Sequence, residues 1–282
     1  MTDFFGRLNL STLFLVATPI GNLEDITLRA LRVLREASLI ATEDTRSTRH
    51  LLEHFGINQP MLSYFEHNKL ARLDRILAAL EVGDVALVSE AGTPLLSDPG
   101  YELLQAAIER GIPVVPLPGP SALLTALSVS GLATDRFLFL GFLPRRAAQR
   151  RQALAEVAGL RATLVWFEAP HRLRGALADA QAVLGGGRRC AVCRELTKLH
   201  EEVWRGTLAE AAAEWQARAP RGEFTLVVEG APAATPWDEA RVRRALAEQQ
   251  AAGAGRAEAA RRVAALSGWS RSAVYALWPE AG

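Results

Sequence analysis

Short, nearly continuous apolar runs recur along the first half of the chain, and helix-like segments separate them. Residues 13–17 and 85–89 are the clearest of these runs. A strand that is buried on both faces gives such a run, whereas a half-exposed strand alternates apolar and polar residues. The pattern therefore predicts an α/β domain whose parallel sheet is covered by helices on both sides. Its other predicted strands are 39–42, 61–63 and 112–117, and its predicted helices are 28–37, 45–55, 70–82 and 101–110.

A second block of mixed character begins near residue 137. The apolar segments 189–196 and 201–205 are close enough to form a hairpin, which favours antiparallel edges. A Pro/Ala linker at 231–236 follows, and the last segment predicts three short helices, two of them compatible with a helix-turn-helix. The other predicted strands of this block are 137–142, 162–167 and 224–229, and its predicted helices are 145–158, 172–184 and 208–218. The predicted domains are therefore 11–122 (parallel α/β), 123–231 (mixed α/β) and 237–282 (helical tail).

Composition narrows the class of protein. Charged residues make up 22% of the chain and its net charge is +1, which excludes a disordered chain and a uniformly basic nucleic-acid binder. The longest uncharged run, 111–134, contains four prolines and cannot form a membrane helix. The N-terminus has no apolar signal core, so we expect a soluble, cytoplasmic protein. Cys190 and Cys193 have no second pair for zinc, and we interpret them as neighbours on a buried strand.

Four loops at predicted strand ends are longer or richer in Gly and Pro than a turn requires. In parallel sheets, ligands bind at the carboxyl ends of the strands, where these loops would meet. The phosphate-binding motifs of dinucleotide sites and P-loops are absent, as are a nucleophile elbow and a zinc cluster. We therefore expect a pocket that recognises its ligand without metal or pyrophosphate. The loops are 18–25, 43–46, 90–100 and 118–122.

Six motifs in order along residues 13–230 resemble the tetrapyrrole-methylase superfamily of S-adenosylmethionine-dependent enzymes. They are VATPIGNLED (16–25), EDTR (43–46), SEAGTP (89–94), PLPGPS (116–121), FEAPHR (167–172) and RELTKLHEE (194–202). The resemblance implies a class III methyltransferase fold, in which two α/β domains enclose a cleft, and a homodimer. The small helical C-terminal segment is predicted from the sequence pattern alone, because the resemblance is less clear after residue 237. The closest similarity is to the branch that methylates the 2′-oxygen of a cytidine in 16S rRNA of the small ribosomal subunit.

The resemblance also implies which residues bind the methyl donor, S-adenosylmethionine. In tetrapyrrole-modifying relatives the third loop contains Gly-Asp-Pro, whereas this chain has Gly92-Thr93-Pro94. The loss of that carboxylate argues against an identical donor pose and against a tetrapyrrole substrate. The expected donor-binding residues are Thr18, Pro19, Ile20, Gly21, Glu90, Gly92, Thr93, Pro94, Leu96, Ser121 and Ala122.

A ribose hydroxyl is barely acidic, so its methylation benefits from a base or a proton relay. Candidates are Glu43, Asp44, His67, Glu168, His171 and Glu195 with Lys198. Each candidate also has a purely structural explanation. Glu43 or Asp44 could cap the following helix, His171 could form a local hydrogen bond, and Glu195 could form a structural ion pair. Arg46 and Arg172 suit phosphate contacts. The expected functional set is Asp44, Arg46, His171, Arg172, Glu195 and Lys198, with no single base chosen.

RNA binding has a local electrostatic basis. Residues 144–161 contain five arginines (145, 146, 150, 151 and 161) and a single acid, and we expect this patch to contact phosphates. Residues 235–282 contain seven arginines and five acids, which a solvated helix face explains equally well. Two other functions stay open: a tetrapyrrole methyltransferase acting on a corrinoid precursor, and a non-catalytic protein whose tail reads nucleic acid.

Overall fold

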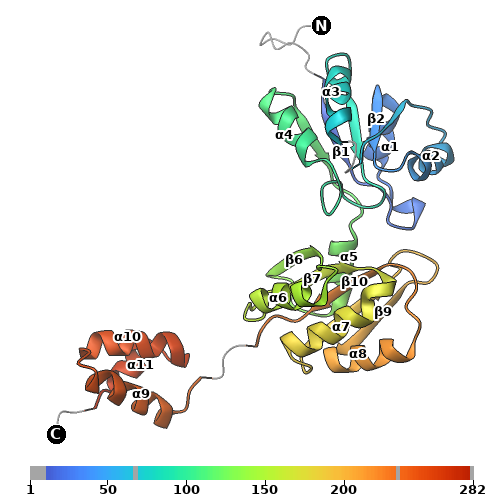
Figure 1. Cartoon of the computed structure of the whole chain (residues 1–282). Helices are drawn as coiled ribbons and strands as arrows, with labels where there is room; N and C mark the ends of the chain where they lie inside the picture. The colour runs from blue at the N-terminus through green and yellow to red at the C-terminus, as the bar shows by residue number, and fades with distance from the viewer. Residues whose placement is uncertain (1–10, 66–68, 233–235, 280–282) are drawn as a thin grey trace. The chain divides into compact units, whose positions relative to one another are not determined.

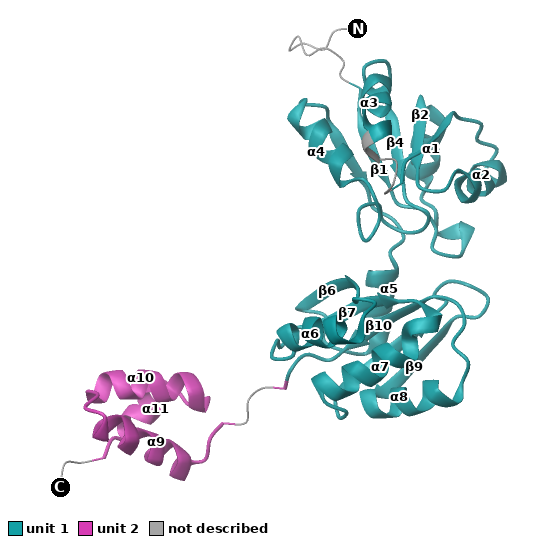
Figure 2. Cartoon of the chain, in the orientation of Figure 1, with its two compact units in different colours: residues 1–231 teal, residues 232–282 magenta. Residues whose placement is uncertain are grey.

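The computed structural model describes residues 11–65, 69–232 and 236–279. The chain forms two compact units, residues 1–231 and 232–282 (Figure 2). The first unit contains two five-stranded sheets. We call the sheet β1–β5 with helices α1–α4 the first lobe, and the sheet β6–β10 with helices α5–α8 the second lobe. The boundary predicted near residue 122 stays a prediction, because both sheets belong to one compact unit.

The sheet of the first lobe is entirely parallel, in the order β3-β2-β4-β1-β5. Parallel pairing puts the carboxyl end of every strand at one edge, as the apolar runs predicted. The strands are β1 (Leu13–Val16), β2 (Leu39–Thr42), β3 (Met61–Ser63), β4 (Val85–Val88) and β5 (Val114–Leu117). The helices are α1 (Leu28–Glu36), α2 (Thr45–His54), α3 (Lys69–Leu80) and α4 (Tyr101–Glu109), with a 3-10 turn at Leu23–Asp25.

Helices cover both faces of this sheet (Figure 1). Leu34 of α1 and Leu52 of α2 pack on one face, in a cluster that includes Val16 and Val88. On the other face, apolar side chains of α3 and α4 pack against Leu13, Val85 and Leu87. Because successive residues of a strand point to opposite faces, these strands need apolar residues at nearly every position. That requirement explains the continuous apolar runs.

The sheet of the second lobe is mixed, in the order β6-β7-β10-β8-β9. Only the β6–β7 pair is parallel, and the predicted hairpin is the antiparallel pair β8–β9. The strands are β6 (Phe137–Phe142), β7 (Thr163–Glu168), β8 (Arg189–Arg194), β9 (Glu202–Thr207) and β10 (Phe224–Val228). The helices are α5 (Ala122–Ser130), α6 (Ala147–Val157), α7 (Pro170–Leu184) and α8 (Leu208–Ala217).

The second sheet is also buried on both faces. Side chains of α6, α7 and α8 form one core cluster with it, and α5 packs on the opposite face. Cys190 belongs to the first cluster and Cys193 to the second, so the two free thiols lie on opposite faces of β8. Burial raises the pKa of each thiol to about 12, which makes both cysteines unreactive. The interpretation of neighbouring positions on a buried strand is confirmed.

The second compact unit contains the three helices predicted for the tail, namely α9 (Glu239–Ala251), α10 (Arg256–Ser267) and α11 (Arg271–Ala276). They share a small apolar core that includes Val242, Leu246 and Val263. Gly268 ends α10 in the left-handed conformation, and the Ser270 side chain caps α11. Nowhere in the described ranges is a helix both long and apolar enough to cross a membrane.

The prediction that Arg150 is an exposed phosphate contact is wrong. Arg150 is only 7% exposed and forms an ion pair of 2.6 Å with Asp179 of α7. Its guanidinium also donates to the backbone oxygens of Pro144 and Arg145. Arg150 thus joins α6 to α7 inside the second lobe. Arg145, Arg146, Arg151 and Arg161 of the same patch are exposed.

We expect the R150A substitution to lower the free energy of unfolding by about 3–5 kcal/mol, because it leaves the charge of Asp179 buried without its main partner. R151A is the matched control: Arg151 contacts the same carboxylate at 3.1 Å but its side chain is 49% exposed, so we expect at most about 1 kcal/mol. Urea denaturation measures both. Equal losses in the two variants would contradict the assignment of Arg150 as a buried structural residue.

Candidate functional site

A cavity of about 540 Å³ lies at the carboxyl edge of the first sheet. Loops after β1, β4 and β5 line it, together with the first turn of α2 and segments of the second lobe around β6, β7, β8 and β10. The lining residues are Pro19, Ile20, Gly21, Ser47, Glu90, Ala91, Gly92, Thr93, Leu96, Ser97, Asp98, Ser121, Ala122, Phe142, Phe167, Glu168, Ala169, Pro170, Lys198, Glu223, Phe224 and Thr225.

Hydrogen bonds tie the three loops of the first lobe together. The backbones of Thr18 and Gly92 exchange two N–H to carbonyl bonds of 2.9 Å, which form an isolated β-bridge. The Ser89 hydroxyl donates to the Gly92 oxygen at 3.0 Å, and the Thr93 hydroxyl donates to the oxygen of Pro120 at 3.2 Å. The Thr18–Gly92 bridge and the Thr93 hydroxyl therefore fix the loops after β1, β4 and β5 against one another.

Lys198, in the loop after β8, reaches the first loop of the other lobe. Its alkyl chain crosses directly over Gly21, where an added Cβ would lie 2.2 Å from Cγ of Lys198. Only a residue without a side chain leaves room for this crossing. The contact brings the β8–β9 loop of the second lobe against the β1 loop of the first lobe, at the wall of the cavity.

The ammonium group of Lys198 lies between two carboxylates. It donates to Glu195 Oε1 at 3.0 Å and to Glu223 Oε2 at 2.9 Å. Burial opposes its charge, but the hydrogen bonds to the two carboxylates raise the pKa of Lys198. Burial likewise opposes the charge of Glu195, while hydrogen bonds from Glu223 N–H and Lys198 lower its pKa. Both groups stay ionised near neutral pH, so neither is suited to exchange a proton there.

Carboxylates also gather on the first-lobe side of the cavity. Burial, followed by the nearby charges of Glu43 and Glu90, raises the pKa of Asp98 to about 7. Burial also raises the pKa of Glu43, with Glu90 and Asp44 contributing. A positively charged ligand placed beside Asp98 and Glu90 would relieve this mutual repulsion.

Glu168, the last residue of β7, is buried in the opposite wall. Its Oε1 accepts a hydrogen bond of 3.0 Å from Ala169 N–H and lies 3.0 Å from Nε of Arg172. Its Oε2 is buried and has no hydrogen-bond partner within the described residues. Burial raises the pKa of Glu168, although Ala169 N–H and Arg172 act in the other direction. Oε1 of Glu168 thus has hydrogen-bonding and ionic partners, whereas Oε2 has none among the described residues.

Backbone strain is concentrated beside the cavity. Within the described ranges, the non-glycine residues with positive φ are Leu95 and Ser97 in the loop after β4 and Glu195 and Thr197 in the loop after β8. Their φ values are 74°, 70°, 49° and 67°. Such conformations cost roughly 1–3 kcal/mol each and are common at functional sites. The two strained loops belong to different lobes and both contribute lining residues.

Most of the residues expected to bind the donor lie together. The two exceptions are Thr18 and Pro94, which are buried beside the cavity without lining it. Thr18 acts through its bridge to Gly92. The nine that line the cavity are Pro19, Ile20, Gly21, Glu90, Gly92, Thr93, Leu96, Ser121 and Ala122.

The residues expected to act in catalysis are more dispersed. Only Lys198 lines the cavity, and Glu195 contacts it through Lys198. Asp44 caps α2 by accepting a hydrogen bond of 2.8 Å from Arg46 N–H, and this bond lowers its pKa. The side chain of Arg46 is 90% exposed.

The two remaining candidates lie in the first turn of α7. His171 is exposed there. Arg172 donates to the oxygen of Leu143 and pairs with Glu168, an arrangement that favours a positioning role over a phosphate contact. His67, a further candidate base, lies outside the described residues.

Sequence reasoning missed several residues of the lining. Ser97 and Asp98 belong to a loop that was recognised, but nothing in its sequence showed which residues turn inward. Phe142 and Glu223 carry no signal that distinguishes them from ordinary strand ends, and Phe167 belongs to the FEAPHR motif but is not among the expected site residues. Glu168 is a candidate base by sequence but does not belong to the expected functional set.

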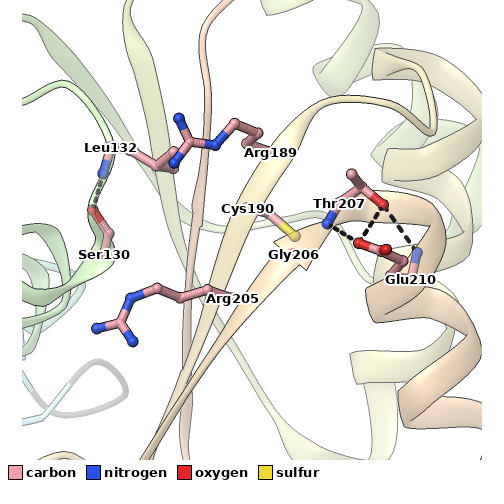
Figure 3. Close-up of a pocket in the computed structure, with 8 residues that line it drawn as sticks. All are labelled: Ser130, Leu132, Arg189, Cys190, Arg205, Gly206, Thr207 and Glu210. Carbon is pink, nitrogen blue, oxygen red and sulfur yellow. Dashed lines mark hydrogen bonds between the residues drawn. The ribbon is translucent and has the colours of Figure 1, made fainter.

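A second, smaller pocket of about 360 Å³ lies near the end of α5 (Figure 3). The arginines in its wall donate to carbonyl oxygens there, Arg205 to Val129 and Arg189 to Gly131. Glu210, hydrogen-bonded to Thr207, lies on the other side of Cys190 in this view. The arginines therefore satisfy a helix end, and we assign this pocket no ligand. Across the described part of the chain, no group of three or more His, Cys, Asp or Glu is arranged to hold a metal.

Comparison with known proteins gives consistent similarities. Residues 12–212 match the profile of the tetrapyrrole (corrin/porphyrin) methylases. A Halalkalibacterium halodurans protein named ribosomal RNA small subunit methyltransferase I is 55% identical over 221 residues, 78% of this chain and 76% of that protein. A Synechocystis protein of the same name is 48% identical over 271 residues, 94% of this chain and 96% of that protein.

Solved structures support the fold alone. A cobalt precorrin-4 methyltransferase superposes with a TM-score of 0.62 at 13% identity, and covers 80% of this chain and 98% of its own. Uroporphyrin III C-methyltransferase from Thermus thermophilus gives 0.55 at 20% identity, covering 77% and 97%. The expected two-lobed α/β architecture is confirmed.

We expect D98N to stabilise the protein at pH 8 and to have little effect at pH 4. Burial and two neighbouring carboxylates raise the pKa of Asp98 from 3.8 to about 7, so folding loses stability as the pH rises through this interval. Asparagine removes that penalty. Thermal unfolding at several pH values measures the difference, with D135N as the exposed control. An identical shift of D98N at both pH values would contradict this account.

Proposed function

The chain belongs to the tetrapyrrole methylase family, and from this premise we propose that it transfers a methyl group from S-adenosylmethionine to the 2′-hydroxyl of a cytidine in 16S rRNA. Relatives named ribosomal RNA small subunit methyltransferase I, at 44–55% identity, support an RNA substrate. The observation that carries the proposal is the cavity of about 540 Å³ that both lobes line. It offers one wall of tied loops to the donor and another wall to the acceptor.

The residues of the cavity fit S-adenosylmethionine. Its volume lies in the range of small-molecule sites, and Ile20, Leu96 and Phe167 provide apolar walls. Gly92, at φ 80°, has the left-handed conformation that favours glycine, and an added Cβ would lie only 3.3 Å from Cγ2 of Ile20. The carboxylates of Glu90 and Asp98 suit a ligand that carries positive charge on a sulfonium and an amino group. We propose that the donor is held by Thr18, Pro19, Ile20, Gly21, Glu90, Gly92, Thr93, Pro94, Leu96, Ser121 and Ala122.

When bound, the donor supplies an electrophilic methyl carbon. The chain's own residues orient the acceptor and exclude water, and orientation is worth up to about 7–11 kcal/mol in favourable cases. We propose that exposed Arg46 contacts an RNA phosphate and that Asp44 holds its helix end. Lys198, held between Glu195 and Glu223, keeps the acceptor-side loop in place. His171 and Arg172 complete the acceptor side, where Arg172 positions Glu168.

The proposed partner is the small ribosomal subunit in the cytoplasm, bound by a homodimer of this chain without a metal. The tetrapyrrole alternative is not favoured, because three tetrapyrrole methyltransferase structures that superpose on this chain are only 13–22% identical to it, whereas the relatives named for rRNA reach 44–55%. No observation on the lining favours a macrocyclic substrate over RNA.

Incubation of the protein with radiolabelled S-adenosylmethionine and undermethylated small subunits tests the proposal. We expect label on the ribose of one cytidine of 16S rRNA, mapped by nuclease digestion. Label on a base atom would overturn the 2′-O assignment. Absence of label from RNA, together with label on a corrinoid precursor, would favour the tetrapyrrole alternative.

We expect R145E/R146E to weaken RNA binding and to flatten its salt dependence, with donor affinity unchanged. Both side chains are exposed beside α6, and each lost phosphate contact lowers the salt slope by about 1. Filter binding at several salt concentrations measures the slope. R29E/R32E, on exposed positions of α1, is the charge-matched control. Equal effects of the two variants would show that net charge, rather than this patch, governs binding.

A further inference from the structure

Two hydroxyl groups in the wall of the cavity have no hydrogen-bond partner among the described residues. Ser121, at the end of the loop after β5, is 8% exposed, and Thr225 of β10 is 5% exposed. Both residues line the cavity. The unpartnered side-chain atoms that are fully enclosed belong to other residues, such as Glu168, so both hydroxyl oxygens keep accessible surface. Since nearly buried polar groups are normally paired, these two hydroxyls indicate that a ligand completes their hydrogen bonds.

The strand register directs the side chain of Thr225 toward the face of the second sheet that α5 covers. Val227, two residues further along β10, belongs to the same apolar cluster as Leu123 of α5. Leu226 belongs to the core on the opposite face. Because side chains alternate along a strand, Thr225 shares the face of Val227. Its pairing partner on β7 is Phe167, which also lines the cavity. Thr225 and α5 therefore meet the cavity on one side of this sheet.

The N-terminus of α5 is uncapped where it meets the cavity. Ser121 is the N-cap residue, but its hydroxyl accepts no hydrogen bond from the helix, although serine is a favoured cap. The first N–H groups of a helix have no acceptor within it, and those of residues 122–124, the first of which lines the cavity, find none among the described residues. Thr125 N–H is the first to bond within the helix, to the oxygen of Ser121. The start of α7 also lines the cavity, but there Ala169 N–H already donates to Glu168.

The electrostatics of the cavity restrict where an anionic group can bind. Glu90 and Asp98 belong to the lining and repel another carboxylate. The ammonium group of Lys198 is already engaged by Glu195 and Glu223. The N-terminus of a helix carries about half a positive charge and presents free N–H groups, which together favour an anion. The start of α5 is therefore the part of the lining best suited to a carboxylate.

We propose that the carboxylate of the methionyl group of S-adenosylmethionine binds at the N-terminus of α5, where the hydroxyls of Ser121 and Thr225 and the first N–H groups of the helix donate to it. This subsite rests on the proposed function, which names the donor without assigning its carboxylate to any residue. Thr225 lies outside the six sequence motifs and becomes a specificity-determining residue for the donor. The carboxylate takes up hydrogen bonds that the chain by itself leaves unmade.

The substitutions T225V and S121A each remove one hydroxyl oxygen and change little else in the wall. Calorimetry compares the affinity of each variant for S-adenosylmethionine with its affinity for decarboxylated S-adenosylmethionine, which lacks the group that the subsite binds. We expect each variant to bind S-adenosylmethionine roughly 10–100-fold more weakly than the wild type, because it loses a hydrogen bond to a charged group. Its affinity for the decarboxylated compound should stay at the wild-type value.

T125V is the matched control. Thr125 also carries a hydroxyl on α5, but it is half-buried and lies outside the lining. We expect T125V to bind both compounds as the wild type does. Thermal unfolding verifies that each variant is folded, and should either T225V or S121A not fold, the other one decides.

The outcomes separate this subsite from the proposed function. Equal weakening of both compounds by T225V and S121A would overturn the assignment, because the hydroxyls would then contact another part of the donor. Unchanged affinity for S-adenosylmethionine in these variants would also overturn it, while the proposed function would stand. A wild-type protein that binds the donor with the expected pattern but does not methylate RNA would overturn the proposed function alone. A wild-type protein that does not bind S-adenosylmethionine would overturn both.

Discussion

The parallel register of the first sheet is the constraint on which the site depends. Since β1, β4 and β5 run in one direction, their following loops must share one edge. The backbone bridge between Thr18 and Gly92 then locks two of these loops together, and the bond from Thr93 to Pro120 adds the third. The resulting wall is fixed before any ligand enters. Preorganisation of this kind lowers the entropic cost of binding.

The two lobes contribute different chemistry. The first lobe offers backbone, small side chains and mutually repelling carboxylates, which together suit a cation. The second lobe offers a buried carboxylate held by an arginine and a lysine held by two carboxylates. Strained residues in the loops after β4 and β8 mark the two places where the lobes approach the cavity.

Local sequence was sufficient for much of the fold, because a doubly covered parallel strand must be apolar at consecutive positions. The same argument located the loops at the site, since turn chemistry is also local. The roles of individual polar residues were less predictable. The sequence places Arg150 in a run of arginines that is expected to be exposed, but in the structure Arg150 is buried in an ion pair with Asp179 of another helix. Burial of the Glu168 side chain likewise depends on the packing of the folded lobe, which local sequence does not encode.

The crossing of Lys198 over Gly21 has an evolutionary consequence. The two residues, on separate lobes, compete for one volume, so a methyl group at position 21 is tolerated only where the chain at position 198 has been shortened or redirected. Sequence drift at either position is therefore conditional on the other. A chimaera that exchanged one lobe alone would be exposed to this collision if it joined a side chain at position 21 to a full-length lysine at position 198.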